Sequence, residues 1–312
     1  MSVQQLAYLK LAFAMILVGG FIALNKMITT VFPIFLFSEL RLGIAGIIFI
    51  MLLLWKEKKF SLPKGKDLLV LFFQSLVGVF LFSIFLLYGI RYTSAIESGI
   101  ITSLTPAMVG VISYFILKEA LNRFQISGII LAVAGTLSIN IFGIASNATW
   151  SLYSLLGNLC ILFAVFGEAV FVTFGKMVSS KISPLAISTI IICMGALMFL
   201  PLAIVDAQNF SFTEVTLFEW GLVFYSSVIV TVGAVLLMTQ AVKELAGGST
   251  AIFTAFMPIS AVLVSYLFLG ETIKWYHILG FSFVLCSIYL ISKEKEADLP
   301  LLTSQQQEGP SQ

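Results

Sequence analysis

Long apolar runs separated by short polar segments dominate this chain. An apolar run of about 18 or more residues can cross roughly 30 Å of hydrocarbon as an α-helix. The pattern predicts ten such helices, at residues 7–25, 33–55, 68–90, 95–117, 124–142, 152–174, 184–205, 217–240, 249–269 and 275–292. Because an even number of spans returns the chain to its starting side, both termini are expected on one face of the membrane.

Part of this pattern occurs twice, at a constant offset of 152 positions. Pro106 returns as Pro258, and the other matched pairs are Tyr114 and Tyr266, Leu117 and Leu269, Glu119 and Glu271, and Gly128 and Gly280. The chain therefore divides into two halves of five helices, residues 1–143 and 152–292. Since five is odd, the second half is predicted to be inverted relative to the first. Residues 293–312, rich in Gln and Ser, are predicted to form a disordered cytoplasmic tail.

Composition agrees with a membrane location. The 312 residues are 60% hydrophobic and only 10% charged, whereas soluble domains carry about 25% charged residues. The fold class expected is therefore an all-α polytopic membrane protein with the lipid bilayer as its partner. A net charge of +2 gives no indication of nucleic-acid binding. Neither the three cysteines nor the sole histidine, His277, has metal-ligand spacing, so no cofactor or metal is predicted.

Lysine and arginine are concentrated on one predicted side of the membrane. The segment from Lys56 to Lys66 contains five lysines, whereas the opposite side receives only Lys26, Arg91 and Lys274. Short loops rich in these residues face the cytoplasm. We therefore expect both termini to be cytoplasmic.

Several motifs together carry a family resemblance. They are Pro106 to Glu119 with Gly135, the repeated Pro258 to Glu271 with Gly280, Pro33 to Arg41, and Gly19 followed seven residues later by Lys26. Over residues 10 to 292 the chain resembles the drug/metabolite transporter superfamily and, within it, the EamA-type ten-helix carriers. Val18 stands where that family usually has a tryptophan.

The resemblance implies a fold and a function. Helices 1 to 4 and 6 to 9 would line a cavity, and helices 5 and 10 would lie at the periphery or in a homodimer contact. The transported molecules would be small organic metabolites, often amino acids and frequently moved outward. For a carrier of this kind the expected location is a bacterial cytoplasmic (inner) membrane.

Glu168 and Lys176 are candidate site residues in the second half. Ionisable groups inside membrane spans are costly and by default functional. Glu168 lies about two thirds of the way along the span 152–174, where it is expected to face the cavity. It could bind a substrate ammonium group or take up a coupling proton, or it could be a structural group bonded to a neighbouring helix. Lys176, about two turns further on, would share that face.

Arg41, Glu39 and Lys26 are the candidates in the first half. Arg41 lies ~12 Å along the helix from Pro33, near mid-membrane, where it could bind a substrate carboxylate bidentately. The alternative is an architectural ion pair between helices. Glu39 is two residues away and must point in a different direction from Arg41; in the alternative reading it could reach the outer mouth. Lys26, near the outer end of the first helix, could contact substrate or extend to the interface.

The two repeated prolines and the acids at helix ends have different expected roles. Pro106 and Pro258 each remove a backbone donor and free a carbonyl four residues earlier. Each could therefore bend its helix beside a ligand, although proline is also common in membrane helices without such a role. Glu97 at a helix start is expected to complement the helix dipole. Glu119 and Glu271 close their helices, so capping or turn roles are expected.

The leading functional hypothesis is a secondary transporter, an exporter or exchanger, of a small metabolite such as an amino acid or derivative. It would work by alternating access, with proton coupling as one hypothesis. No phosphate-binding Gly-x-x-x-x-Gly-Lys loop is present to use ATP. Nucleotide-linked or phosphorylated anions are the alternative substrates, but they call for a larger basic cluster than Arg41, Lys26 and Lys176. A non-transporting scaffold is a further alternative, while sparse acids and one histidine argue against a membrane-embedded enzyme.

Overall fold

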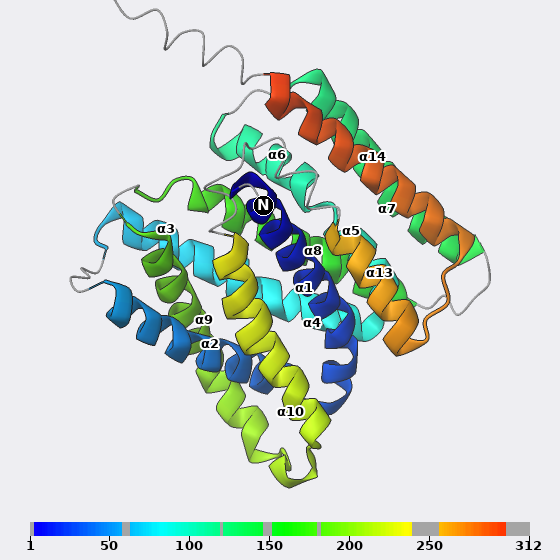
Figure 1. Cartoon of the computed structure of the whole chain (residues 1–312). Helices are drawn as coiled ribbons and strands as arrows, with labels where there is room; N and C mark the ends of the chain where they lie inside the picture. Colours follow the sequence, from blue (N-terminus) through cyan, green and yellow to red (C-terminus); the bar gives the residue numbers. More distant parts are fainter. Residues whose placement is uncertain are drawn as a thin grey trace, which may run out of the picture.

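The structure is a computed structural model that describes residues 3–57, 63–118, 121–145, 152–179, 182–238 and 256–297. In these ranges every regular element is a helix (Figure 1). The first half contains α1 (Val3–Val31), α2 (Ile34–Lys56), α3 (Lys66–Ser75), the π-helix η1 (Leu76–Leu81), α4 (Phe82–Tyr92), α5 (Ala95–Thr102), α6 (Thr105–Ile116) and α7 (Arg123–Ala145). The second contains α8 (Leu152–Gly175), α9 (Pro184–Gln208), the 3₁₀ turn η2 (Phe212–Glu214), α10 (Leu217–Phe224), the π-helix η3 (Tyr225–Ala234), α13 (Phe256–Leu269) and α14 (Trp275–Ala297).

Eight helical segments in the described ranges are long and apolar enough to cross a membrane. They are Gln5–Val31, Ile34–Lys56, Lys66–Tyr92, Ala95–Ile116, Arg123–Phe142, Leu152–Gly175, Pro184–Gln208 and Leu217–Met238, which confirms the positions of the first eight predicted spans. Two shorter apolar helices, Phe256–Leu269 and Trp275–Leu290, coincide with the remaining two. Residues 249–255 of the ninth predicted span lie outside the described part, and the count of ten stays a prediction.

The predicted C-terminal tail and the lysine-rich segment from Lys56 to Lys66 lie only partly within the described residues. α14 continues to Ala297, so the last helix extends beyond the predicted boundary at residue 292. Residues 298–312 of the predicted tail and residues 58–62 of the lysine-rich segment lie outside the described part.

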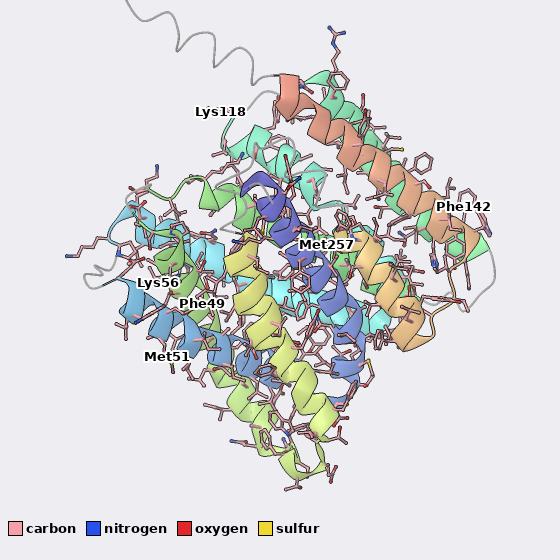
Figure 2. The ribbon with its side chains drawn as sticks, viewed as in Figure 1. Phe49, Met51, Lys56, Lys118, Phe142 and Met257 are labelled. Atoms are coloured by element: carbon pink, nitrogen blue, oxygen red, sulfur yellow. The ribbon has the colours of Figure 1, made fainter. Side chains whose placement is uncertain are left out.

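The outside of the bundle is apolar. On α2, Phe49 is fully buried, whereas Met51 is 62% and Trp55 is 78% exposed. Figure 2 labels Phe49 and Met51 on this helix. Exposed apolar side chains on this scale would favour aggregation in water, but lipid tails solvate them without cost. The helices therefore have one face for protein and one for lipid, which is why the sequence is apolar almost all round each span.

α7 and α14 pack side by side at one edge of the bundle (Figure 1). A Cβ atom added to Gly135 would lie 2.9 Å from the carbonyl oxygen of Gly280, and one added to Gly280 would lie 2.5 Å from the Ile139 side chain. Near one end of the pair the Phe142 and Trp275 rings are 4.8 Å apart. Small residues thus let the two backbones approach closely within one chain.

α5 and α13, which belong to the two copies of the repeat, pack against each other in opposite directions. A Cβ atom on Gly99 in α5 would lie 2.6 Å from the Ala261 side chain in α13. Ala95, at the start of α5, contacts Glu271, which follows the end of α13. α1 also packs against α13, since a Cβ atom on Gly19 in α1 would lie 2.1 Å from the carbonyl oxygen of Met257 in α13.

Regular α-helix is interrupted inside several spans. η1 lies within the span Lys66–Tyr92, and η3 lies within Leu217–Met238. The span Ala95–Ile116 is broken at Ser103 and Leu104, and Pro106 is the second residue of α6. The bend predicted at Pro106 is therefore a break between two helices. Pro258 lies in the first turn of α13, and the residues before that helix are outside the described part.

Candidate functional site

A cavity of about 230 Å³ lies in the middle of the bundle, and we call it the central cavity. Its lining comes from α1, α2, η1, α4, α5, α8, α9, η3 with the helical residues 235–238 after it, and α13. Among the described lining residues none belongs to α7 or α14, as the family resemblance implied. The lining is mainly apolar and includes Met15, Phe21, Phe82, Phe171, Val230 and Met257.

Arg41 is the basic group of the central cavity. Its side chain comes from α2 and is 8% exposed. Nη2 donates to Ser83 Oγ at 2.8 Å, and the guanidinium lies 5.4 Å from the centre of the Phe21 ring. Nε is buried without a hydrogen-bond partner. A buried donor without an acceptor is destabilising, so this guanidinium can still bind a carboxylate.

Glu168 is the acidic group of the same cavity. A Cβ atom on its neighbour Gly167 would lie 2.7 Å from the Val77 carbonyl oxygen, so α8 packs closely on η1 at this level. That contact turns the adjacent Glu168 towards the cavity, where its Oε2 lies 2.7 Å from Thr105 Oγ1. A carboxyl and a guanidinium therefore share one apolar cavity, each with a neutral partner.

Two other predicted site residues lie away from the central cavity. Glu39 is half-buried on α2, and its Oε2 has no hydrogen-bond partner. Arg41 lines the cavity and Glu39 does not, which agrees with the expectation that the two point in different directions. Lys176 is exposed in the turn after α8 and does not line the central cavity. Their functional roles stay predictions.

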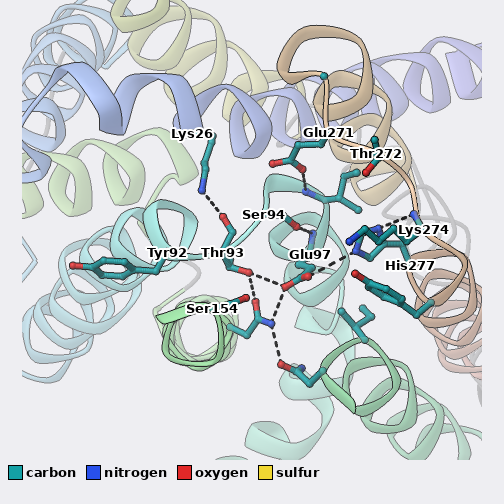
Figure 3. A pocket seen from close by; sticks show the side chains of 16 residues that line it. Lys26, Tyr92, Thr93, Ser94, Glu97, Ser154, Glu271, Thr272, Lys274 and His277 are labelled. Carbon is teal, nitrogen blue, oxygen red and sulfur yellow. Dashed lines mark hydrogen bonds and ion pairs between the residues drawn. The ribbon is translucent and has the colours of Figure 1, made fainter. Parts of the chain in front are cut away.

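A second cavity, of about 500 Å³, lies where α4 passes into α5 and α13 passes into α14; we call this end of the bundle the Glu271 end (Figure 3). Glu97 lies at its centre. Glu97 Oε2 accepts hydrogen bonds from Thr93 Oγ1 at 2.8 Å and from Asn158 Nδ2 at 2.9 Å. Asn158 Nδ2 also donates to Asn140 Oδ1 at 2.9 Å. Glu97 lies in the first turn of α5, as its expected role at the helix dipole requires, and Ser94 caps that helix. The hydrogen bonds from Thr93 and Asn158 are further contacts of Glu97.

His277 also faces this second cavity. Its Nε2 lies 3.8 Å from Glu97 Oε1, and its Nδ1 accepts a hydrogen bond from the backbone N–H of Lys274 at 3.2 Å. No cluster in the sequence indicates a partner for His277, yet the structure places Glu97 beside it. The two residues come from different halves of the chain, and no spacing rule connects them.

Lys26 extends from α1 into the second cavity. Its ammonium donates to the backbone carbonyls of Ile90 at 2.7 Å, Arg91 at 3.3 Å and Thr93. These carbonyls end α4, where the helix dipole favours a cation. Lys26 is therefore bound to a helix end within the protein, and its contact with substrate stays a prediction.

Glu271 makes the complementary contact with the next helix. Its two carboxylate oxygens accept hydrogen bonds from the backbone N–H groups of Ala95 at 2.8 Å and Ile96 at 2.9 Å. The N-terminus of a helix has unpaired donors and favours an anion. Glu271 therefore has a capping role, but it caps the start of α5 and not the end of its own helix. Glu119 lies outside the described part.

The fold and the cavities define a multi-pass integral membrane protein of the transporter class. The chain belongs to the EamA-like transporter family, whose profile matches residues 5–141 and 155–293. The uncharacterized transporter YetK of Bacillus subtilis is 41% identical over 296 residues, which cover 95% of this chain and 89% of YetK. The protein is accordingly a membrane transporter and not an enzyme.

More distant relatives have the same overall form. A WAT1-related chloroplastic protein of Arabidopsis thaliana is 24% identical over 283 residues, covering 87% of this chain and 65% of the relative. A solved structure described as "Crystal structure of protein" superimposes with a TM-score of 0.66 at 16% identity. It covers 93% of this chain and 98% of the other, and at this identity the likeness supports the fold alone.

Proposed function

We propose that the protein is a secondary transporter of a small zwitterionic metabolite, an amino acid or derivative with an apolar side chain. The observation that carries this proposal is the presence of Arg41 and Glu168 in one apolar cavity. Arg41 would bind the substrate carboxylate. Glu168 would bind the ammonium group or carry a coupling proton. The phenylalanine and methionine side chains would contact the apolar part.

The size and charge of the central cavity favour this substrate class over nucleotide-linked or phosphorylated anions. Its volume of about 230 Å³ lies below the range of about 300–1,000 Å³ typical of sites for drug-sized ligands. Arg41 is the one basic side chain among its described lining residues, since Lys26 faces the second cavity and Lys176 is exposed. A nucleotide sugar would bring more bulk and more negative charge than these groups accommodate.

Transport would proceed by alternating access between two inverted halves of five helices. α5 begins the fourth predicted span and α13 ends the ninth, which are the matching spans of the two halves, and their opposite directions support the inversion. Lys26 and Glu271 join α1 and the α13–α14 turn to the junction of α4 and α5, so these contacts hold the two halves together at the Glu271 end. In the orientation predicted from the lysines, with both termini cytoplasmic, that end faces outside.

The proposal also includes the membrane in which the protein lies and the energy source that drives transport. The relatives in Bacillus subtilis support a bacterial cytoplasmic membrane. A carrier without a phosphate-binding loop uses a gradient of substrate or protons, which suits export or exchange. Proton coupling would place the proton on Glu168.

Reconstitution into liposomes tests the proposal. The wild type, Arg41→Gln and Glu168→Gln are compared for uptake from a panel of metabolites under imposed pH gradients, with the exposed acid variant Glu214→Gln as a matched control. We expect transport of neutral amino acids with apolar side chains, a strongly raised half-saturating concentration in Arg41→Gln, and loss of gradient dependence in Glu168→Gln. Wild-type behaviour of both cavity variants would exclude the central cavity as the site. Retained gradient dependence in Glu168→Gln would exclude its proton role.

A further inference from the structure

The break between α5 and α6 leaves one backbone carbonyl dependent on a side chain. In a continuous helix the N–H of residue 106 would donate to the carbonyl of residue 102, but Pro106 has no N–H. The hydroxyl of Thr105 takes the place of that donor, because its Oγ1 lies 2.8 Å from the Thr102 carbonyl oxygen. Thr102 is the last residue of α5 and is itself buried.

The same hydroxyl is also the partner of Glu168. Thr105 Oγ1 lies 2.7 Å from Glu168 Oε2 as well as 2.8 Å from the Thr102 oxygen. A hydroxyl has a single proton to donate. With Glu168 ionised, both contacts are donations from Thr105, so its single proton is shared between the carboxylate and the carbonyl. With Glu168 protonated, the carboxyl can donate to Thr105 Oγ1, and the Thr105 proton is then free for the Thr102 carbonyl.

We propose that Thr105 is a positioning residue that couples the protonation of Glu168 to the junction of α5 and α6. When Glu168 releases its proton to water in the central cavity, the carboxylate attracts the Thr105 proton and the Thr102 carbonyl loses its donor. An unpaired carbonyl in a dry interior is destabilising, so the junction at Ser103 and Leu104 loosens. Uptake of a proton from cavity water restores both hydrogen bonds. The inference rests on the proposed function and gives it a coupling step.

The hydrogen-bonded series of Glu168, Thr105 and the Thr102 carbonyl is the main contact of Glu168 that depends on its protonation. Arg41 on α2 is the other charged side chain among the described lining residues of the cavity. The titratable residues in the elements that pack on α8 are Lys66 and Asp67 in α3, Tyr88, Arg91 and Tyr92 in α4, Glu97 in α5 and Tyr114 in α6, and η1 has none. None of these lines the central cavity.

Four variants separate the steps. Thr105→Val removes the hydroxyl at nearly constant shape, and Thr105→Ser keeps it. Pro106→Ala restores the backbone donor for Thr102, so the carbonyl no longer needs Thr105. Glu168→Gln fixes a neutral group at the cavity.

Two measurements on the full-length protein in lipid nanodiscs test the proposal without substrate. Infrared difference spectra across pH report the carboxylic-acid C=O band that Glu168→Gln lacks. Spin labels on cysteines at the exposed positions Tyr92 and Phe115, in a background without Cys160, Cys193 and Cys286, report the distance across the junction.

We expect the wild type and Thr105→Ser to show a distance distribution that changes with pH, with the same midpoint as the C=O band. The distance should be independent of pH in Thr105→Val, Pro106→Ala and Glu168→Gln, and the band in Thr105→Val should shift to higher frequency. A wild-type pH response of the distance in Thr105→Val or Pro106→Ala would overturn the coupling. If Thr105→Val does not fold, Pro106→Ala and Thr105→Ser decide.

The failure of the coupling and the failure of the proposed function are distinguishable. A pH-independent distance in a wild type that transports through Glu168 would overturn the coupling alone. An intact pH response without transport of any metabolite would overturn the proposed function alone.

Discussion

Glu271 caps α5 through a hydrogen bond from the backbone N–H of Ala95 at 2.8 Å, across a sequence separation of 176 residues. The acid belongs to the second copy of the repeat and the capped helix to the first. Glu271 lines the second cavity at this end of the bundle (Figure 3). This contact therefore joins the two halves at one end of the bundle, and neither residue lines the central cavity.

Removal of the cap should destabilise the protein. Glu271→Ala leaves two N–H groups at the start of α5 without their acceptor, and we expect a loss of about 1–3 kcal/mol. Thermal unfolding in detergent measures the change. Thr272→Ala, an exposed neighbour in the same turn, is the matched control and should unfold as the wild type does. Equal melting temperatures for the two variants would show that the cap contributes nothing.

Lys26 should stabilise the junction of α4 and α5 from the α4 side. Lys26→Met keeps the length of the side chain but removes the ammonium that binds three carbonyls at the end of α4. We expect stability to fall by about 1–3 kcal/mol, in the same unfolding assay. Lys64→Met, at an exposed position, serves as control. If Lys26→Met were as stable as this control, the contacts with the carbonyls would not contribute to the stability of the protein.

How much of the fold and of the candidate site could be predicted from the sequence depends on how far apart in the chain the interacting residues lie. Apolar runs fix the spans because the cost of burying backbone in lipid acts on each segment alone, and eight spans lie where the pattern predicts them. A helix-end role for Glu271 also follows from its position after an apolar run. Its target does not, because the sequence holds no signal that connects it to Ala95. The same is true of His277 and Glu97, which are close only in space.

The central cavity was partly predictable for a similar reason. Arg41 and Glu168 are each conspicuous as charges within apolar spans, and each could be named alone. That they line one cavity depends on how α2 and α8 pack, which no local pattern encodes. Pro106 predicts an orphaned carbonyl at Thr102 from spacing, but the link through Thr105 to Glu168 requires the position of a third helix.

The close approach of α1 and α13 predicts opposite results for two glycine substitutions. In Gly19→Ala the new Cβ atom would lie 2.1 Å from the Met257 carbonyl oxygen, so the helices must separate. We expect a loss of about 1–3 kcal/mol from overpacking. In Gly221→Ala the Cβ atom meets nothing within 4 Å, and a gain of up to about 1 kcal/mol from helix propensity is expected. Equal stability of the two variants, measured by thermal unfolding, would contradict this packing.

Ser83 should affect substrate binding through Arg41. Ser83→Ala removes the acceptor of the 2.8 Å hydrogen bond from Nη2 and frees the guanidinium to reorient. A loss of about 1 kcal/mol corresponds to a roughly fivefold higher half-saturating substrate concentration. Transport kinetics in liposomes measure it, with Ser282→Ala on an exposed face of α14 as control. Unchanged kinetics in Ser83→Ala would separate Arg41 from substrate binding.

The most direct test of an alternately accessible central cavity is the reactivity of a cysteine within it. Val18→Cys lines the cavity, and Thr213→Cys, exposed between α9 and α10, is the control, both in a background without the three native cysteines. Sealed vesicles are treated with a membrane-impermeant maleimide from one side or the other. We predict that the cysteine at position 18 reacts from both sides in proportions that substrate changes, while position 213 reacts from one side only. Reaction at position 18 from a single side, unaffected by every metabolite that the protein transports, would contradict alternating access.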